Sequence, residues 1–272
     1  MNNPYYPIDT LVEDIVTETP TIKTFVLVPS RPIKFKAGQF MQLTVPGCGE
    51  APFTPSSSPS VTEKMEISIL RTGKVTEALH ALKPGAEVGL RGPFGKGYPM
   101  DRMEGKEVLV VGGGVGLAPL RSLIYALLEN PKKYKRVSIK YGARMPEELC
   151  FRRQYDGWSK AAPNVDFTNT IDVPAAGWTG RVGLVTTLLD KLDINLENSI
   201  AVSCGPEIML KFVTLKLLEV GYTPAQIYLS MNRKMSCGMG KCGRCNVGHY
   251  YLCVDGPDMC YDKIKHVPNV FG

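Results

Sequence analysis

The sequence predicts an antiparallel β-barrel, then a doubly wound α/β domain built on a parallel sheet, then a small cysteine-rich lobe. Three observations carry this prediction. Hydrophobicity alternates with a period of two in the first part, apolar strands alternate with helices in the middle, and five of the eight cysteines crowd near the end. At 272 residues the chain is long enough for more than one hydrophobic core. We expect the three parts to span residues 1–101, 102–230 and 231–272.

The first part is predicted to be a small barrel with one short helix. Its short alternating runs are separated by turns that contain Pro and Gly, as in antiparallel β-domains. The single helix-length stretch is VTEALHAL at 75–82. The expected strands are TIKTFVLVP, QFMQLTVP, KMEISILR and AEVGLRGP.

The second part is predicted to be a parallel sheet covered by helices on both faces, because its strands and helices alternate. The expected strands are KEVLVV, RVSIKYGAR, SIAVSC and QIYLS. The expected helices lie in LAPLRSLIYALLEN, GRVGLVTTLLDKL and PEIMLKFVTLKLLEVGY.

Two glycine turns follow strands of this sheet and are candidate ligand sites. Four glycines separate the first strand from the first helix: Gly112, Gly113, Gly114 and Gly116. Glycine lets the backbone approach a pyrophosphate, and the helix N-terminus offers amide donors. The alternative is a tight turn without a ligand; a P-loop is excluded because no Walker lysine follows.

The second turn holds Cys204, Gly205 and Pro206 at the carboxyl end of a later strand. Ligands of open α/β sheets bind at that edge, so the two turns belong to one candidate site. Taken alone, Cys204 is more typical of a buried structural cysteine than of a reactive one.

Charge and hydropathy exclude several classes of protein. The net charge of +6 is modest for the length and does not indicate a nucleic-acid-binding protein. The most apolar run, residues 108–120, is too short and too rich in glycine to span a bilayer, and no secretory signal is evident. We expect a cytoplasmic protein without membrane insertion, whose clustered cysteines bind metal or exchange electrons rather than form disulfides.

The cysteine spacing indicates an iron–sulfur cluster. Cys237, Cys242 and Cys245 form a C-x4-C-x2-C run, with Cys253 and Cys260 downstream. This is the plant-type arrangement for a 2Fe–2S cluster, in which a distal cysteine completes the set. Structural zinc is the alternative, although zinc sites more often pair two C-x2-C units and only one is present.

Four motifs, in this order, resemble the ferredoxin–NADP reductase superfamily: APFTPSSSP, GKVTEAL, GGGVGLAPL and CGPEIM. The resemblance implies FAD on the barrel and a nicotinamide nucleotide on the α/β domain. It assigns the flavin ring to Pro52, Phe53 and Thr54 and the flavin pyrophosphate to Gly73, Lys74, Val75 and Thr76. Ala51 stands where the family usually has arginine. Each motif alone also fits a plain loop, with Thr76 as a helix cap.

The tail resembles that of three related groups: the gamma subunits of sulfhydrogenases and NiFe hydrogenases, the corresponding subunit of anaerobic sulfite reductase, and the iron–sulfur/flavin subunit of type B dihydroorotate dehydrogenase. CVDGP matches their distal cysteine, which makes Cys253 the fourth ligand and leaves Cys260 out. His249, between the ligands, is expected at the tip of a hairpin.

The resemblance implies an oxidoreductase subunit that passes electrons between NAD(P)H and a partner through FAD and a 2Fe–2S cluster. Thr54 would lie near the reactive ring nitrogen of the flavin, and Cys204 near the nicotinamide carbon that carries hydride. The implied partners are larger catalytic redox subunits, with ferredoxin as a further candidate. The alternative is a non-catalytic electron-transfer or scaffold subunit that binds no nicotinamide nucleotide.

The choice between NAD(H) and NADP(H) depends on the loop after the second strand of the sheet. Arg144 could pair with a 2′-phosphate, whereas Glu147 and Glu148 would repel one or bind a ribose hydroxyl. We expect NAD(H).

Overall fold

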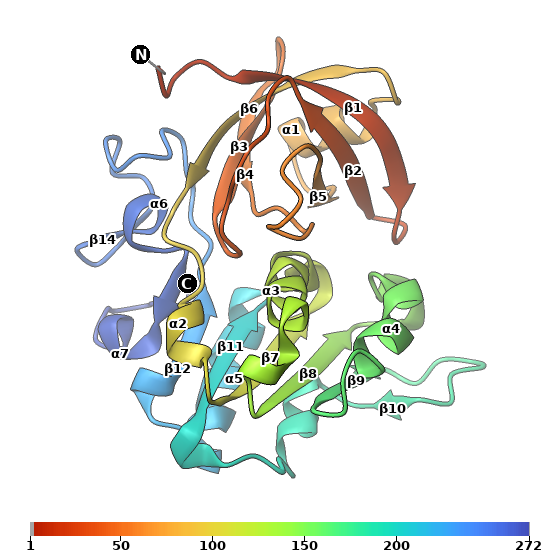
Figure 1. Cartoon of the computed structure of the whole chain (residues 1–272), viewed down its shortest axis with the longest axis vertical. Coiled ribbons are helices and arrows are strands. Elements are labelled where there is room, and N and C mark those ends of the chain that lie inside the picture. Colours follow the sequence, from red (N-terminus) through yellow and green to blue (C-terminus); the bar gives the residue numbers. More distant parts are fainter. Residues whose placement is uncertain (1–2, 272) are drawn as a thin grey trace.

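A computed structural model gives the fold of residues 3–271, the described part of the chain (Figure 1). The β-domain lies at the top of the view and the α/β domain below it, with α3 between them. The C-terminal tail, in blue, packs along the left side against both.

The N-terminal domain is a six-stranded sheet in which every pair of neighbours is antiparallel. The strands are β1 (Ile8–Thr17), β2 (Ile22–Pro29), β3 (Phe40–Val45), β4 (Gly49–Phe53), β5 (Met65–Leu70) and β6 (Glu87–Phe94), in the order β4-β3-β6-β1-β2-β5. Helix α1 (Lys74–His80) follows β5. The predicted barrel architecture is confirmed, with β1 and β4 added to the four expected strands.

The second domain is a seven-stranded sheet in the order β10-β9-β8-β7-β11-β12-β15. Its strands are β7 (Glu107–Gly113), β8 (Arg136–Ala143), β9 (Val165–Ile171), β10 (Arg181–Val182), β11 (Ser199–Cys204), β12 (Ile227–Ser230) and β15 (Asp258–Cys260). Its helices are α2 (Met100–Met103), α3 (Leu117–Glu129), α4 (Tyr155–Ser159) and α5 (Glu207–Val220). The tail adds α6 (Leu252–Asp255), α7 (Tyr261–Ile264) and a hairpin of β13 (Asn246–Val247) and β14 (Tyr250–Tyr251).

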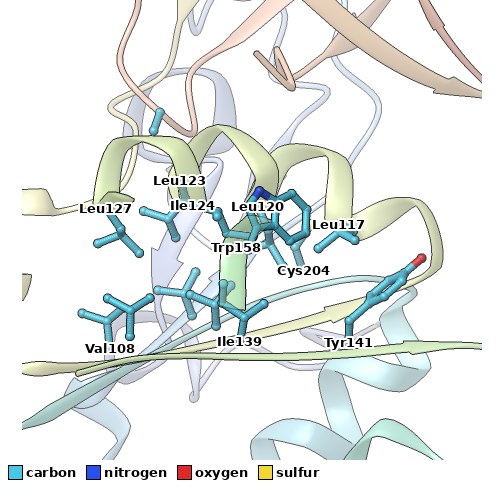
Figure 2. Packing of buried hydrophobic residues seen from close by; sticks show 14 of the residues in the cluster. Val108, Leu117, Leu120, Leu123, Ile124, Leu127, Ile139, Tyr141, Trp158 and Cys204 are labelled. Carbon is cyan, nitrogen blue, oxygen red and sulfur yellow. The ribbon is translucent and has the colours of Figure 1, made fainter. Parts of the chain in front are cut away.

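Strand β7 shows why the sheet is doubly wound. Its side chains are buried on both faces: Val108 and Val110 face the cluster of α3, and Leu109 and Val111 face that of α5. Successive strand residues point to opposite faces, so an unbroken apolar run requires a cover on each. Figure 2 shows the first face, where the leucines and isoleucine of α3 pack onto β7 and β8.

Strand β9 and helix α4 were not among the expected elements. Two further features depart from the expected parallel sheet and its helices. The stretch 180–192 is not an α-helix: it forms β10 and a 3₁₀ helix, Val185–Leu189. Gly183 with φ +139° and the β-branched run that follows it disfavour a regular helix there. In addition, β15 from the tail pairs antiparallel with β12, so the sheet is mixed at one edge. Within residues 3–271, no helix is long and apolar enough to cross a membrane.

Candidate functional site

The two glycine turns meet at the carboxyl edge of the sheet. A Cβ atom on Gly116 would lie 2.3 Å from the carbonyl oxygen of Cys204 and 2.7 Å from Cα of Gly205. A Cβ atom on Gly113 would lie 2.1 Å from Sδ of Met209 on α5. Glycine is therefore required at position 116, where the backbones of the two turns touch, whereas at position 113 the neighbour is the flexible end of the Met209 side chain. Gly114, with φ +54°, has open space where a side chain would be, so its backbone is accessible to a ligand.

A cavity of about 450 Å³ opens beside these turns. Its lining includes glycine backbone at 113–114 and the apolar side chains of Ile208 and Phe212 on α5. Its size and mixed lining suit a small-molecule ligand. Pro206 also lines it, as part of the second turn.

The lining of this cavity also carries charge from Arg144, Glu148 and Asp172. Burial raises the pKa of Asp172, with Arg144 opposing the shift and Glu148 adding to it, so the three groups lie within electrostatic reach. Glu147 is exposed and lies outside the lining. Asp172 follows β9 and has no sequence signature of its own, so only the parallel pairing of β9 with β8 brings it beside Arg144.

Cys204 ends β11 and is buried among the residues under α3. Burial and the nearby Asp258 raise the pKa of its thiol to about 12, so the thiol is neutral at physiological pH. It is held against the α3 turn by the contact of Gly116 with its carbonyl group.

The barrel motif lies at the end of β4. Pro52, Phe53 and Thr54 are half-buried, and Ala51 pairs with Leu43 across the strand. Their partial exposure leaves this surface accessible to a flat ligand.

The GKVT stretch spans the start of α1, with Gly73 before the helix and Lys74, Val75 and Thr76 in its first turn. Gly73 is the N-cap, and Thr76 is the third helical residue rather than the cap. The hydroxyl of Thr76 donates to the carbonyl of Gly73 (2.8 Å) and accepts from the amides of Gly73 (2.8 Å) and Thr72 (2.9 Å). This side chain shapes the loop, and Lys74 and Val75 enter the first helical turn, where backbone amides lack helical partners.

The four cysteines of the loop lie as two neighbouring pairs, Cys237 with Cys242 and Cys245 with Cys253. In the first pair, Sγ of Cys237 accepts hydrogen bonds from the amides of Met239 (3.5 Å), Lys241 (3.3 Å) and Cys242 (3.4 Å). Partial burial raises the pKa of the Cys237 thiol, but these amides outweigh that effect and lower the pKa to about 7. An amide cage of this kind stabilises a thiolate.

In the second pair, Sγ of Cys245 lies 3.3 Å from Sγ of Cys253, and the amide of Gly240 donates to Cys253 (3.1 Å). Burial raises the pKa of the Cys253 thiol to about 12, and the nearby Cys245 adds to the shift. Both cysteines are buried, whereas Cys242 is exposed.

The loop that carries the sulfurs needs its glycines. Gly238, Gly240 and Gly243 have φ of +79°, +76° and +73°, in the left-handed region that glycine favours. Cys260 lies elsewhere, on β15, where its thiol contacts the carbonyls of Pro224 and Ala225. Across residues 3–271, no three His, Cys, Asp or Glu side chains gather closely enough to hold a single metal ion. His249 lies at the exposed tip of the β13–β14 hairpin, as expected.

Arg91 on β6 is a site residue that the sequence did not reveal. Its buried guanidinium pairs with Glu50 and donates to the carbonyls of Ser236 (3.2 Å) and Cys237 (3.3 Å). The ring of Phe94 packs where a side chain on Gly238 would be. The barrel thus holds the start of the cysteine loop.

Arg91→Met is expected to lower the free energy of unfolding by about 2–3 kcal/mol, because Glu50 is then left half-buried without its cation and the carbonyls of Pro4, Ser236 and Cys237 each lose a donor. Urea unfolding measures this. The matched control Lys64→Met breaks the exposed pair with Glu13 and should cost less than about 1 kcal/mol. Equal losses in the two variants would contradict the anchoring role.

Comparisons with known proteins agree with this geometry. The family model described as oxidoreductase FAD-binding domain matches residues 11–98, and the oxidoreductase NAD-binding domain matches residues 110–214. The chain is 37% identical over 242 residues to sulfhydrogenase 1 subunit gamma of Pyrococcus furiosus, an alignment that covers 87% of this chain and 82% of that protein. It belongs to the ferredoxin–NADP reductase superfamily.

Two further similarities extend over nearly the whole chain. The protein of Methanocaldococcus jannaschii named probable dihydroorotate dehydrogenase B (NAD(+)), electron transfer subunit, is 35% identical over 264 residues, 96% of this chain and 92% of that one. The solved structure described as an NADH-dependent reduced ferredoxin-NADP oxidoreductase superposes with a TM-score of 0.76 at 27% identity, covering 97% of this chain and 93% of that one. The predicted superfamily and an oxidoreductase with FAD-binding and NAD-binding domains are confirmed.

Proposed function

We propose that this chain is an electron-transfer subunit that accepts hydride from NADH onto FAD and passes single electrons through a 2Fe–2S cluster to a larger catalytic subunit. The observation that carries the proposal is the cysteine loop: two sulfur pairs, with backbone amides directed at them, on a chain that has FAD-binding and NAD-binding domains.

The geometry of the four thiols favours a two-iron cluster over zinc. A structural zinc ion gathers all four ligands around one centre. Here the Cys242 amide donates to Sγ of Cys237, and Sγ of Cys245 lies 3.3 Å from Sγ of Cys253. Among the described residues, no three His, Cys, Asp or Glu side chains gather around one point. Two pairs match a centre with two irons, each of which takes two protein ligands. The amide donors would compensate the charge on sulfur and tune the potential.

The remaining residues would bind and orient the other cofactors. Bound FAD supplies the exchange of one hydride for two single electrons. We assign the flavin ring to Pro52, Phe53 and Thr54, with Thr54 nearest the reacting edge, and the pyrophosphate to the amides of 73–76. Cys204 would contact the nicotinamide ring as a neutral thiol. The proposed parts remain residues 1–101 for FAD, 102–230 for the nucleotide and 231–272 for the cluster.

The cavity beside the glycine turns would take the nicotinamide nucleotide, with its phosphates along Gly112, Gly113, Gly114 and Gly116. Gly205 and Pro206 complete the opposite turn. Among the charged residues that line this cavity, the carboxylates of Glu148 and Asp172 outnumber the one cation, Arg144. Two carboxylates disfavour a 2′-phosphate and offer acceptors to a ribose diol. This charge balance favours NADH over NADPH.

The relatives suggest the partner. They are named as a gamma subunit and as an electron transfer subunit, so we propose that this chain also serves a larger catalytic redox subunit, or ferredoxin, in a complex. A non-catalytic scaffold is the competing function, and the missing arginine at Ala51 is the observation in its favour.

Anaerobic titration with NADH tests the proposal. NADH should bleach the flavin absorbance and then reduce the 2Fe–2S cluster, which electron paramagnetic resonance detects. NADPH should do the same only at about tenfold or higher concentration, because one unfavourable charge contact costs roughly that factor in affinity. An unchanged oxidised spectrum would support the scaffold. Bound zinc without acid-labile sulfide would exclude the cluster.

A further inference from the structure

A buried polar chain joins three parts of the molecule beside Cys204. Ser230, at the end of β12, donates to Oδ1 of Asp258 on β15 at 2.5 Å. The hydroxyl groups of Ser230 and Tyr98 lie 2.9 Å apart. Tyr98 belongs to the segment between β6 and α2, so the tail, the sheet and the interdomain connection share one hydrogen-bonded group.

Asp258 is held there without a cation. Its residue is 8% exposed, and Oδ2 has no hydrogen-bond partner within the described residues. The loop at Gly38 closes over it, since a Cβ on that glycine would lie 2.1 Å from Oδ2. A buried carboxylate with no cation beside it and one oxygen without a donor is costly, so the acid form is favoured. Burial accordingly raises the pKa of Asp258 to about 8, with Ser230 and Tyr98 opposing the shift.

Other charged groups near Asp258 line the cavity on its open side. That cavity has a volume of about 690 Å³ and is separate from the one beside the glycine turns. The charged side chains that line it include both cations and carboxylates, so their effects on Asp258 oppose one another. These side chains are Lys36, Lys96, Asp101, Arg102, Asp255 and Lys263. The titratable groups in the buried chain itself are Tyr98, Cys204 and Asp258.

Ser230 connects Asp258 to Cys204. Ser203 pairs with Leu229 in the β11–β12 ladder, which places Cys204 next to Ser230. The hydroxyl of Ser230 lies within reach of the Cys204 thiol, and this interaction lowers the thiol pKa against the effect of burial. A serine hydroxyl has one proton to donate. When Asp258 is ionised, that proton is directed to the carboxylate; when Asp258 is protonated, the acid can donate to Ser230, whose proton is then free for sulfur.

We propose that Asp258 is a positioning residue for the hydride site: by holding or releasing the Ser230 proton, it sets whether the Cys204 thiol accepts or donates a hydrogen bond. The role in hydride transfer rests on the proposed function, whereas the hydrogen-bond switch itself does not. The device transmits the ionisation of Asp258 on the edge strand β15 through Ser230 to the thiol on β11, along one face of the sheet.

The test compares the wild-type holoprotein with Asp258→Asn, which keeps the shape of the neutral acid but cannot ionise. Two rates are measured from pH 6.5 to 9.5: flavin reduction by NADH, and alkylation of Cys204 by iodoacetamide followed by mass spectrometry. In the wild type each rate should change by about two- to tenfold around an inflection near pH 8, which is the effect of one hydrogen bond. In Asp258→Asn both inflections should be absent. Asp101→Asn, at the same cavity, should keep both.

Thermal unfolding provides a third readout. Since the folded pKa of about 8 lies above the ordinary value of 3.8, the folded state retains a proton that the unfolded state loses, and stability falls as pH rises from about 4 to 8. Asp258→Asn should flatten this slope. Ser230→Ala should keep the slope but remove the inflection at Cys204.

The outcomes separate the two proposals. If NADH fails to reduce the wild-type flavin, the proposed function is wrong, while alkylation and unfolding still decide the switch. If wild type and Asp258→Asn show the same pH dependence of alkylation and unfolding, the switch is wrong whatever NADH does.

Discussion

Cys253→Ala is expected to abolish the proposed 2Fe–2S cluster while leaving FAD bound. Cys253 is buried 3.3 Å from Cys245 and receives the amide of Gly240, so its loss removes a ligand that the surrounding backbone already supports. Loss of a hydrogen bond to a metal ligand alone costs about 10–100-fold in affinity, and loss of the ligand itself should exceed that. Iron and acid-labile sulfide should fall to background, with one FAD per chain retained.

Cys260→Ala is the matched control. Cys260 is also buried, but its thiol points to the carbonyls of Pro224 and Ala225 rather than to the loop. It should keep iron, sulfide and FAD. If Cys260→Ala loses the cluster and Cys253→Ala retains it, the fourth ligand is Cys260.

Gly116→Ala is expected to damage both stability and nucleotide binding. The added Cβ would meet backbone atoms of Cys204 and Gly205 at 2.3–2.7 Å, and backbone at that point cannot move without parting the two turns. Overpacking of this kind costs about 1–3 kcal/mol. We expect a loss at the upper end of that range in urea unfolding, and at least about tenfold weaker NADH binding in the flavin titration.

Gly157→Ala provides the control for glycine substitution as such. Gly157 lies in α4, and a Cβ there meets nothing within 4 Å. Alanine should leave NADH binding unchanged and raise stability by up to about 1 kcal/mol. If Gly157→Ala loses as much stability as Gly116→Ala, the contact between the turns is not the cause.

The sequence could predict those parts of the fold that depend on local patterns of residues. Alternation predicts the barrel strands, and the unbroken run at Val108–Val111 predicts a strand buried on both faces. β4 was missed because Pro52 disrupts the pattern of a strand. The helix predicted within 180–192 was wrong because the apolar spacing there fits a helix, while two glycines and a β-branched run prevent one.

The candidate site divides in the same way. The spacing of Cys237, Cys242 and Cys245 is local and could be recognised in sequence. Arg91 and Asp258 could not, because their roles depend on partners 146 and 28 residues away, Cys237 and Ser230. Neither carries a motif; each is identified only by burial together with the atoms it meets.

The edge strand β15 has a consequence for solubility. β12 is four residues long, and without β15 its outer backbone donors and acceptors would be open to a strand from any other chain. An uncovered edge of that kind is a template for aggregation. The tail that carries the cysteine loop therefore also covers the edge of the sheet. A chain that ended at residue 230 would leave β12 as an exposed edge strand.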